Sequence, residues 1–128
     1  MDFSLNETQK MIKDMVADFA AKEIAAVAEK NNREGIFPKE TLVKMAGLGL
    51  MGMNVSEEFG GANVGVVAYA LALMEVSKVC ASTAVAMSVT NMVAEVVEKF
   101  GTREQKSKYL PRLCSGQAIT GSFVLTES

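Results

Sequence analysis

The chain has 128 residues with 13 basic and 15 acidic side chains, so its length fits one domain. Its net charge of −2 excludes an overall basic excess of the kind that holds a nucleic-acid backbone, which argues against a nucleic-acid partner. It contains no His, which excludes a His-assisted nucleophile, a His general base and a His metal ligand within these residues. The longest apolar run, residues 64–74, is too short to span a membrane.

The first ten residues, MDFSLNETQK, have neither the basic start nor the apolar stretch of a signal peptide. The two cysteines, Cys80 and Cys114, lack CxxC spacing, and reduced core cysteines are more frequent than a disulfide in such apolar helical contexts. We therefore expect a reduced, cytoplasmic setting.

The first predicted helix covers residues 6–29. Ser4 and Asn6 are overlapping capping-box candidates, because Glu7 and Gln9 follow them by three positions. Apolar side chains then recur at helical spacing, and the stretch NNREG ends the helix.

A second helix is expected after Pro38, since proline is favoured at the start of a helix. The glycine-rich segment 47–65 is expected to be a loop with a short extended piece at residues 51–55. Gly47 to Gly52 match G-x-G-x-x-G, but dinucleotide binding requires this pattern to follow a strand and open a helix. Here it follows a helix and enters a loop, so helix capping is the better interpretation.

A third helix is predicted over residues 66–79. It is apolar on nearly all sides, which favours a central, buried position. Glu75 lies within it, and a buried carboxylate needs a partner. Lys78, three residues on, can reach it along the helix, so we interpret the pair as a structural anchor.

The fourth helix is expected to begin near Ser82 or Thr83 and to end at Gly101. Thr102 is then an N-cap for a fifth helix, with Gln105 at the reciprocal position. The apolar residues that repeat with helical period along the fourth helix are Val85, Val89, Met92, Val93, Val96, Val97 and Phe100.

A strand pattern appears only at the end, over residues 119–126, so the sequence predicts an all-α helical bundle with one C-terminal strand. Glu7 and the pair Glu57–Glu58 are interpreted as solvated carboxylates, and no complete catalytic constellation or metal site is found. Five methionines lie on apolar helix faces and core filling is the preferred interpretation for them, with Met92 kept open as an exception: Met11, Met15, Met45, Met74 and Met92.

Several segments then occur together in a specific order and spacing. They are EEFGG at 57–61, the third helix with Glu75, STAVAMSVTN at 82–91, FGTREQKSKYLPRLCSG at 100–116 and GSFVLTES at 121–128. Together they resemble the N-terminal helical domain of the acyl-CoA dehydrogenases, over essentially the whole chain. The resemblance implies that residues 1–117 form this domain and that residues 118–128 begin the middle β-domain with a flavin-binding strand.

By this resemblance, the enzyme would hold FAD between three domains, and FVLTES is similar to the first half of the family's flavin-binding stretch. The implied cofactor contacts are Phe123, Val124, Leu125, Thr126, Glu127 and Ser128. Ser128 stands where the family often has Pro. The implied wall for the acyl tail is formed by Ala84, Val85, Ser88 and Met92, with ordinary helix packing as the alternative for these four.

The implied function is that of an FAD-dependent acyl-CoA dehydrogenase, which desaturates an acyl-CoA thioester between its α and β carbons and passes electrons to an electron-transfer flavoprotein. Family members are commonly homotetramers. No residue here can be assigned the carboxylate base that removes the α-proton, so no catalytic residue is named and the chain alone is expected to be inactive. Two alternatives remain: an acyl-CoA oxidase-like flavoenzyme, and a free-standing helical interaction domain without catalysis.

Overall fold

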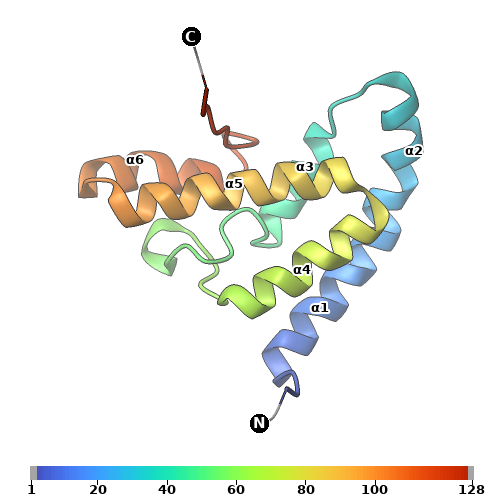
Figure 1. The fold of residues 1–128 in the computed structure, drawn as a ribbon, viewed down its shortest axis with the longest axis horizontal. Helices are drawn as coiled ribbons and strands as arrows, with labels where there is room; N and C mark the ends of the chain where they lie inside the picture. The colour runs from blue at the N-terminus through green and yellow to red at the C-terminus, as the bar shows by residue number, and fades with distance from the viewer. Residues whose placement is uncertain (1–2, 127–128) are drawn as a thin grey trace.

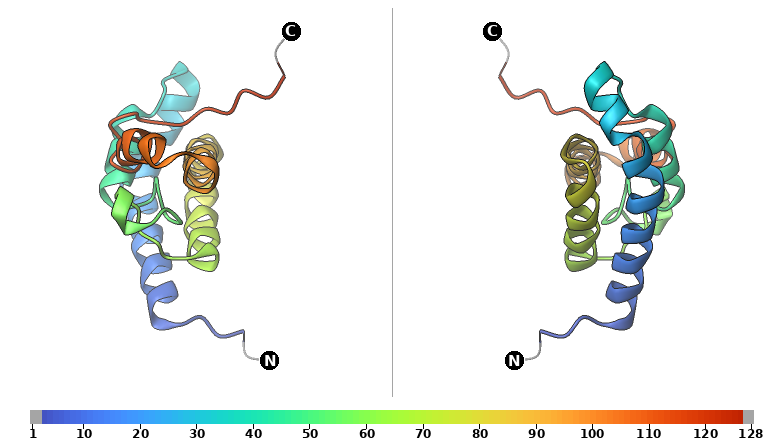
Figure 2. Two further views of the ribbon diagram at one scale, coloured as in Figure 1. Left: turned by 90° about the vertical axis from the view of Figure 1, so that its left-hand side faces the viewer. Right: turned by 90° about the vertical axis from the view of Figure 1, so that its right-hand side faces the viewer.

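The computed structural model describes residues 3–126, and within this range the chain is helical, with no strand. The elements in chain order are α1 (Glu7–Phe19), a π-helical turn (Ala20–Ile24), α2 (Ala25–Glu34), α3 (Lys39–Gly47), a 3-10 turn (Glu57–Phe59), α4 (Val66–Val79), α5 (Ala81–Phe100) and α6 (Arg103–Cys114). Helices α4 and α5 form one layer, and α1, α3 and α6 form a second layer that packs against one face of the first (Figures 1 and 2).

The first helical run starts as predicted but ends later. Asn6 accepts a hydrogen bond from the backbone N–H of Gln9, and the Gln9 side chain accepts one from the backbone N–H of Asn6, which confirms the second capping box. The run continues through the π-helical turn to Glu34 rather than residue 29. It stops at Gly35, whose φ of 65° is the left-handed conformation that glycine adopts without a steric penalty.

The core has two parts. The larger lies between α1, the π-helical turn, α3, α4 and the start of α5, and the smaller lies between α6, the end of α5 and the 3-10 turn. The methionines that fill the core are Met45, Met51, Met53 and Met87. Of the five methionines predicted to do so, only Met45 is buried, because Met11, Met15, Met74 and Met92 lie on helix faces that no other described element covers.

Helix α4 is not buried on all sides, so this prediction is wrong. Its small side chains Ala68 and Ala72 pack in the core, whereas Val66, Val67 and Met74 are exposed. A helix that packs on one side only presents its remaining faces to solvent, whatever their composition. This chain therefore exposes apolar side chains that a larger assembly could cover.

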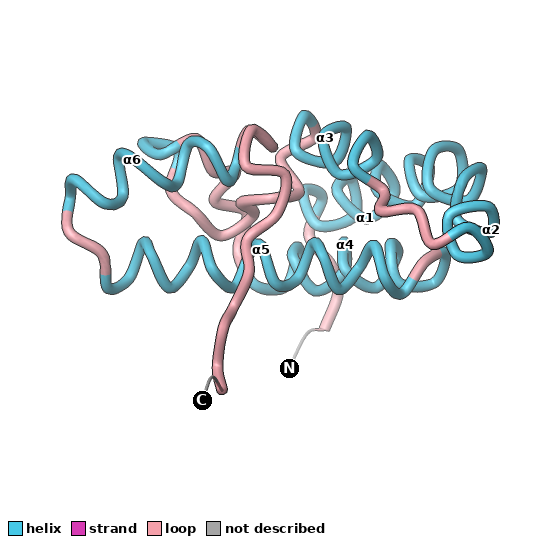
Figure 3. Tube along the Cα trace, turned by 90° about the horizontal axis from the view of Figure 1, so that it is seen from above, coloured by secondary structure: helices cyan, strands magenta, loops and turns pink. Residues whose placement is uncertain are grey.

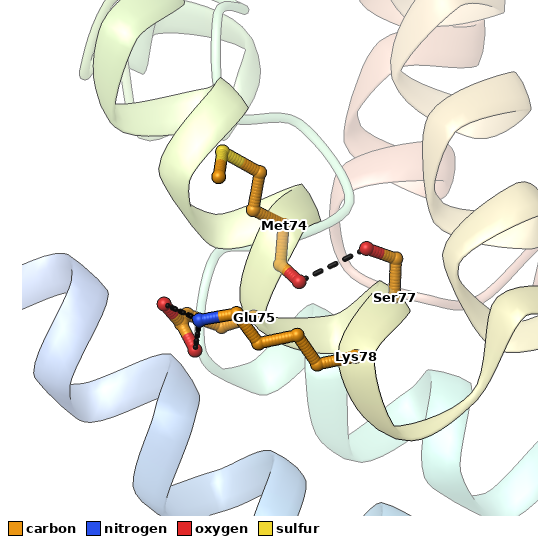
Figure 4. A network of polar contacts seen from close by, with 4 residues as sticks. All are labelled: Met74, Glu75, Ser77 and Lys78. Carbon is orange, nitrogen blue, oxygen red and sulfur yellow. Dashed lines mark hydrogen bonds and ion pairs between the residues drawn. The ribbon is translucent and has the colours of Figure 1, made fainter.

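The Glu75–Lys78 anchor predicted on α4 is confirmed. Both carboxylate oxygens of Glu75 accept hydrogen bonds from the Lys78 ammonium, at 2.7 and 2.8 Å, and the Glu75 side chain faces α1 (Figure 4). The Ser77 hydroxyl donates to the carbonyl oxygen of Met74 at 2.9 Å in the same turn. The pair gives the buried carboxylate the partner that its burial requires.

The glycine-rich segment 47–65 is a loop, as predicted, but residues 51–55 form turns rather than an extended piece. Gly49, with a φ of 77°, lies just after the end of α3, which agrees with the capping interpretation of the G-x-G-x-x-G letters. The loop is folded back on itself, since the N–H of Val64 donates to the carbonyl oxygen of Met53 at 2.8 Å.

The strand predicted over residues 119–126 is not formed. This segment is irregular, crosses α5 and then leaves the body of the molecule (Figure 3). A strand is stabilised by hydrogen bonds to a neighbouring strand, and residues 3–126 contain none for it to pair with. No helix among the described residues is long and apolar enough to cross a membrane.

Candidate functional site

Helix α5 presents the four residues predicted to line an acyl tail on two different faces. Val85 is 59% exposed and Met92 is 43% exposed, and the half-buried Ser88 lies between them, so these three share the outer face. Ala84 is only 5% exposed and packs in the larger core. The geometry therefore leaves three of the four predicted residues accessible to a ligand.

The outer face of α5 continues beyond Met92 as an apolar surface. Val96 and Phe100 follow it at helical spacing and are exposed. A shallow groove lies here, lined by Tyr69, Met92, Glu95, Val96, Lys99 and Phe100. Of the valines that repeat along α5, Val85 and Val96 thus face outward. Val93 and Val97 pack against the smaller core.

The buried face of α5 is lined by Thr83, Ala84, Met87, Thr90, Asn91 and Ala94. Asn91 makes three hydrogen bonds there: its side-chain oxygen accepts from the N–H of Met53 at 2.8 Å, and its amide donates to the carbonyls of Leu50 and Met87. These bonds hold the glycine-rich loop against α5. Sequence reasoning missed Asn91, and the available signal was the one amide side chain of this helix.

The C-terminal segment is attached to α5 at Thr90, the residue before Asn91. The hydroxyl of Thr90, which is fully buried, accepts a hydrogen bond from the backbone N–H of Gly121 at 3.0 Å and donates to the carbonyl oxygen of Ala86 at 2.8 Å. The chain approaches α5 so closely that a Cβ on Gly121 would lie 2.9 Å from the Cβ of Val93. Sequence reasoning missed this contact as well, since nothing local pairs residues 31 positions apart.

Beyond Gly121, the residues predicted to contact a flavin are exposed. Phe123 is 46% exposed, Leu125 is 81% exposed, and Val124 and Thr126 are also accessible. Glu127 and Ser128 lie outside the described residues. An aromatic ring, apolar neighbours, a hydroxyl and free backbone groups are the chemistry that suits a flat ring system with a hydrogen-bonding edge, so the exposed residues fit a flavin.

Both cysteine thiols are free, and their surroundings shift their pKa values in opposite directions. Burial, with a smaller contribution from Glu98, raises the pKa of the Cys114 thiol to about 11. Burial also acts on Cys80, but hydrogen bonds with Ser82 and Thr83 outweigh it and lower the pKa of that thiol. Cys114 is a buried core residue as predicted, whereas Cys80 is half-buried at the start of α5.

The candidate carboxylates do not form an acid–base pair or a metal centre. Glu57 and Glu58 are exposed, and Glu58 pairs with Arg103 at 2.7 Å. Glu7 is exposed in the first turn of α1, as predicted. Within residues 3–126, no group of three or more His, Cys, Asp or Glu side chains could hold a metal ion.

Comparison with known proteins gives a consistent result. The model of the acyl-CoA dehydrogenase N-terminal domain matches residues 6–117. The human mitochondrial short-chain specific acyl-CoA dehydrogenase is 44% identical over 124 residues, which cover 96% of this chain and 30% of that protein. This chain spans about a third of the length of the curated relatives it matches.

Two solved structures share the fold. The butyryl-CoA dehydrogenase of Megasphaera elsdenii superposes with a TM-score of 0.83 at 32% identity, over 91% of this chain and 32% of that chain. A chain in the structure of the electron transferring flavoprotein of Acidaminococcus fermentans superposes with a TM-score of 0.86 at 40% identity, over 91% of this chain and 31% of that chain.

Proposed function

The chain belongs to the acyl-CoA dehydrogenase family as its N-terminal helical domain, and we propose that it supplies one wall of the substrate and flavin site of an FAD-dependent acyl-CoA dehydrogenase. One observation supports this proposal: α5 has an exposed apolar face and also holds, through the bond between Thr90 and Gly121, the exposed C-terminal segment that resembles a flavin-binding stretch. We place the boundary with the middle β-domain at residue 117, where the family match ends.

The acyl tail lies, in this proposal, along the outer face of α5. Val85 and Ser88 are small enough to leave room for a hydrocarbon chain, and Met92 stands about 6 Å further along the helix axis from Ser88. The long Met92 side chain would close the end of this wall. We therefore propose a short-chain acyl-CoA as the substrate, in line with the short-chain and butyryl-CoA enzymes that this chain resembles.

FAD is the proposed cofactor, with Phe123 to Ser128 as the contacting stretch. When bound, the flavin accepts the hydride that leaves the β-carbon as the thioester is desaturated. The part of this chain is to present Phe123 toward the ring system and the hydroxyl of Thr126 toward its polar edge. Residues 119–126 would become a strand once the β-domain supplies a partner edge.

The carboxylate that removes the α-proton is proposed to come from outside these 128 residues. The described acidic side chain nearest to Ser88 in the sequence is Glu95, which lies almost two turns further along the outer face of α5 and accepts a hydrogen bond from the Asn54 amide. We propose an electron-transfer flavoprotein as the electron acceptor, since a chain of this fold occurs in the structure of such a protein. A homotetramer and a cytoplasmic location stay predictions.

The test uses the complete product of the coding sequence. Purified protein is expected to show flavin absorption and to reduce an artificial electron acceptor when butyryl-CoA is added. Peroxide formation without acceptor reduction would favour the oxidase-like alternative, because electrons would then pass to oxygen. Protein that folds but shows neither flavin nor turnover would favour the interaction-domain alternative.

A further inference from the structure

Helix α5 contains the residues of the proposed acyl wall and also holds the segment proposed to contact the flavin. Ser88 and Met92 lie two residues before and two residues after Thr90. Gly121, which donates its N–H to the Thr90 hydroxyl at 3.0 Å, lies two residues before Phe123. Two separate parts of the proposed site are therefore connected through a single side chain.

The Thr90 hydroxyl is held by two hydrogen bonds, one as donor and one as acceptor. The Thr90 hydroxyl donates its hydrogen to the Ala86 carbonyl at 2.8 Å, so an oxygen lone pair is left to accept from Gly121. The residue is completely buried, which means that water cannot replace a lost partner. A Cβ at position 121 would lie 2.9 Å from the Cβ of Val93, so a larger residue here requires the segment to move away from α5.

Gly121 is also the last fixed point of the described chain. Before it, Ile119 packs against the larger core and the N–H of Thr120 donates to the carbonyl oxygen of Ala118. After it, residues 122–126 form no hydrogen bond with any other residue in the range 3–126. The contact with Thr90 therefore decides where the exposed segment begins.

We propose that Thr90 is a positioning residue that sets the place of the flavin-contacting segment relative to the acyl wall. This inference rests on the proposed function. Two extended residues span at most about 7 Å, so the contact keeps the backbone of Phe123 within about 7 Å of Gly121, where the chain is bonded to α5. The separation between the acyl tail and the flavin would then be set by one rigid helix.

Loss of the contact would act on binding rather than on chemistry. If the segment occupies its binding-competent place only a tenth of the time, the apparent affinity for the cofactor falls about tenfold. Thr90→Val keeps the shape of the side chain and removes the hydroxyl, whereas Thr90→Ser keeps the hydroxyl. Thr83→Val is the matched control, because Thr83 is a buried threonine on the same helix whose hydroxyl bonds Cys80 instead.

The experiment measures two quantities in the complete protein: the FAD dissociation constant of the reconstituted apoprotein, and hydrogen exchange of the peptide that spans residues 119–126. Thr90→Val is expected to raise the dissociation constant about tenfold and to speed exchange at Gly121 about tenfold, while Thr90→Ser and Thr83→Val stay within about twofold of the wild type. Gly121→Ala, which changes no core side chain, is expected to behave like Thr90→Val and carries the test if that variant does not fold.

Two results would overturn the inference, and they differ. Equal FAD affinity in Thr90→Val, Gly121→Ala and Thr83→Val would show that Thr90 has no role beyond packing, with the proposed function intact. Folded wild-type protein that binds no FAD would remove the proposed function, and this inference with it.

Discussion

Asn91 and Met53 are joined by a buried hydrogen bond of 2.8 Å that spans 38 residues of sequence, in which the Asn91 side-chain oxygen accepts from the backbone N–H of Met53. The same side chain donates to the Leu50 carbonyl, so Asn91 holds the glycine-rich loop against α5, together with the bonds that Glu95 and Glu98 make to the loop. The loop in turn forms part of the core through Met51, Met53 and Val55.

Asn91→Leu is expected to lower the free energy of unfolding by about 3 kcal/mol, because it leaves the Met53 N–H and the Leu50 carbonyl buried without partners. Urea unfolding followed by circular dichroism measures the loss. The matched control is Asn32→Leu at an exposed position of α2, which should stay within about 0.5 kcal/mol of the wild type. Similar losses in both variants would contradict the role assigned to Asn91.

Lys78→Met is expected to destabilise the chain by about 1–2 kcal/mol, since it leaves the buried Glu75 carboxylate without its cation. The exposed position of the Lys78 side chain keeps this value modest. The double variant Glu75→Gln with Lys78→Met should recover part of the loss. Lys22→Met serves as control, because its pair with Asp18 is exposed on both sides and contributes little. Equal effects of the two lysine variants would argue against the anchor.

Alkaline pH is expected to destabilise the fold through Cys114. The folded-state pKa of about 11 lies above the ordinary thiol value, so the stabilisation is complete below about pH 8.5 and is lost as pH rises toward 11. We expect this thiol to account for roughly 1–2 kcal/mol of the loss. Chemical unfolding at several pH values measures the slope, and Cys114→Ala should flatten it. An unchanged slope in that variant would show that other groups cause the loss.

Met92→Ala in the complete protein is expected to shift the substrate preference toward longer acyl chains, because the shorter side chain opens the end of the proposed wall. The ratio of kcat/KM for octanoyl-CoA to that for butyryl-CoA should rise about tenfold. Met74→Ala, an exposed methionine on α4 that does not line the groove beside Met92, is the control and should leave the ratio unchanged. A ratio that does not respond to Met92→Ala would place the acyl tail elsewhere.

The 128-residue chain by itself is expected not to retain flavin. Residues 122–126 offer one exposed side of a site, whereas a ligand of this size is held by burying most of its surface. The measurement is the visible absorption spectrum of the purified chain, with circular dichroism to establish that it is helical. Stoichiometric flavin absorption in that preparation would contradict this expectation and the proposal that the chain supplies only one wall of the flavin site.

The positions at which most helices begin and end could be predicted from the sequence, because the signals are local. The side chains of Asn6 and Thr102 satisfy the first free N–H groups of their own helices, and the N-cap contacts were found where the capping-box pattern placed them. The Glu75–Lys78 pair is equally local, since its two members lie three residues apart on one helix.

The packed face of α5 was not predictable in the same way. Helical spacing gives the period of a pattern, but valines occur on both sides of this helix, and the period does not say which side faces the core. The fold buries Thr83, Thr90 and Asn91, because hydrogen bonds from distant segments satisfy the last two. Larger side chains such as Val85 and Met92 are left outside, and this makes them accessible to a ligand.

The sequence by itself determined the helical class and the caps, since each depends on neighbours within a few positions, whereas the candidate flavin and acyl residues came from its resemblance to a known family. Only the tertiary structure decided that Ala84 belongs to the core, that residues 119–126 stay unpaired, and that Thr90 holds Gly121. The physical reason is that burial and strand formation need partners from elsewhere in the chain, and folding alone brings residues such as 90 and 121 together.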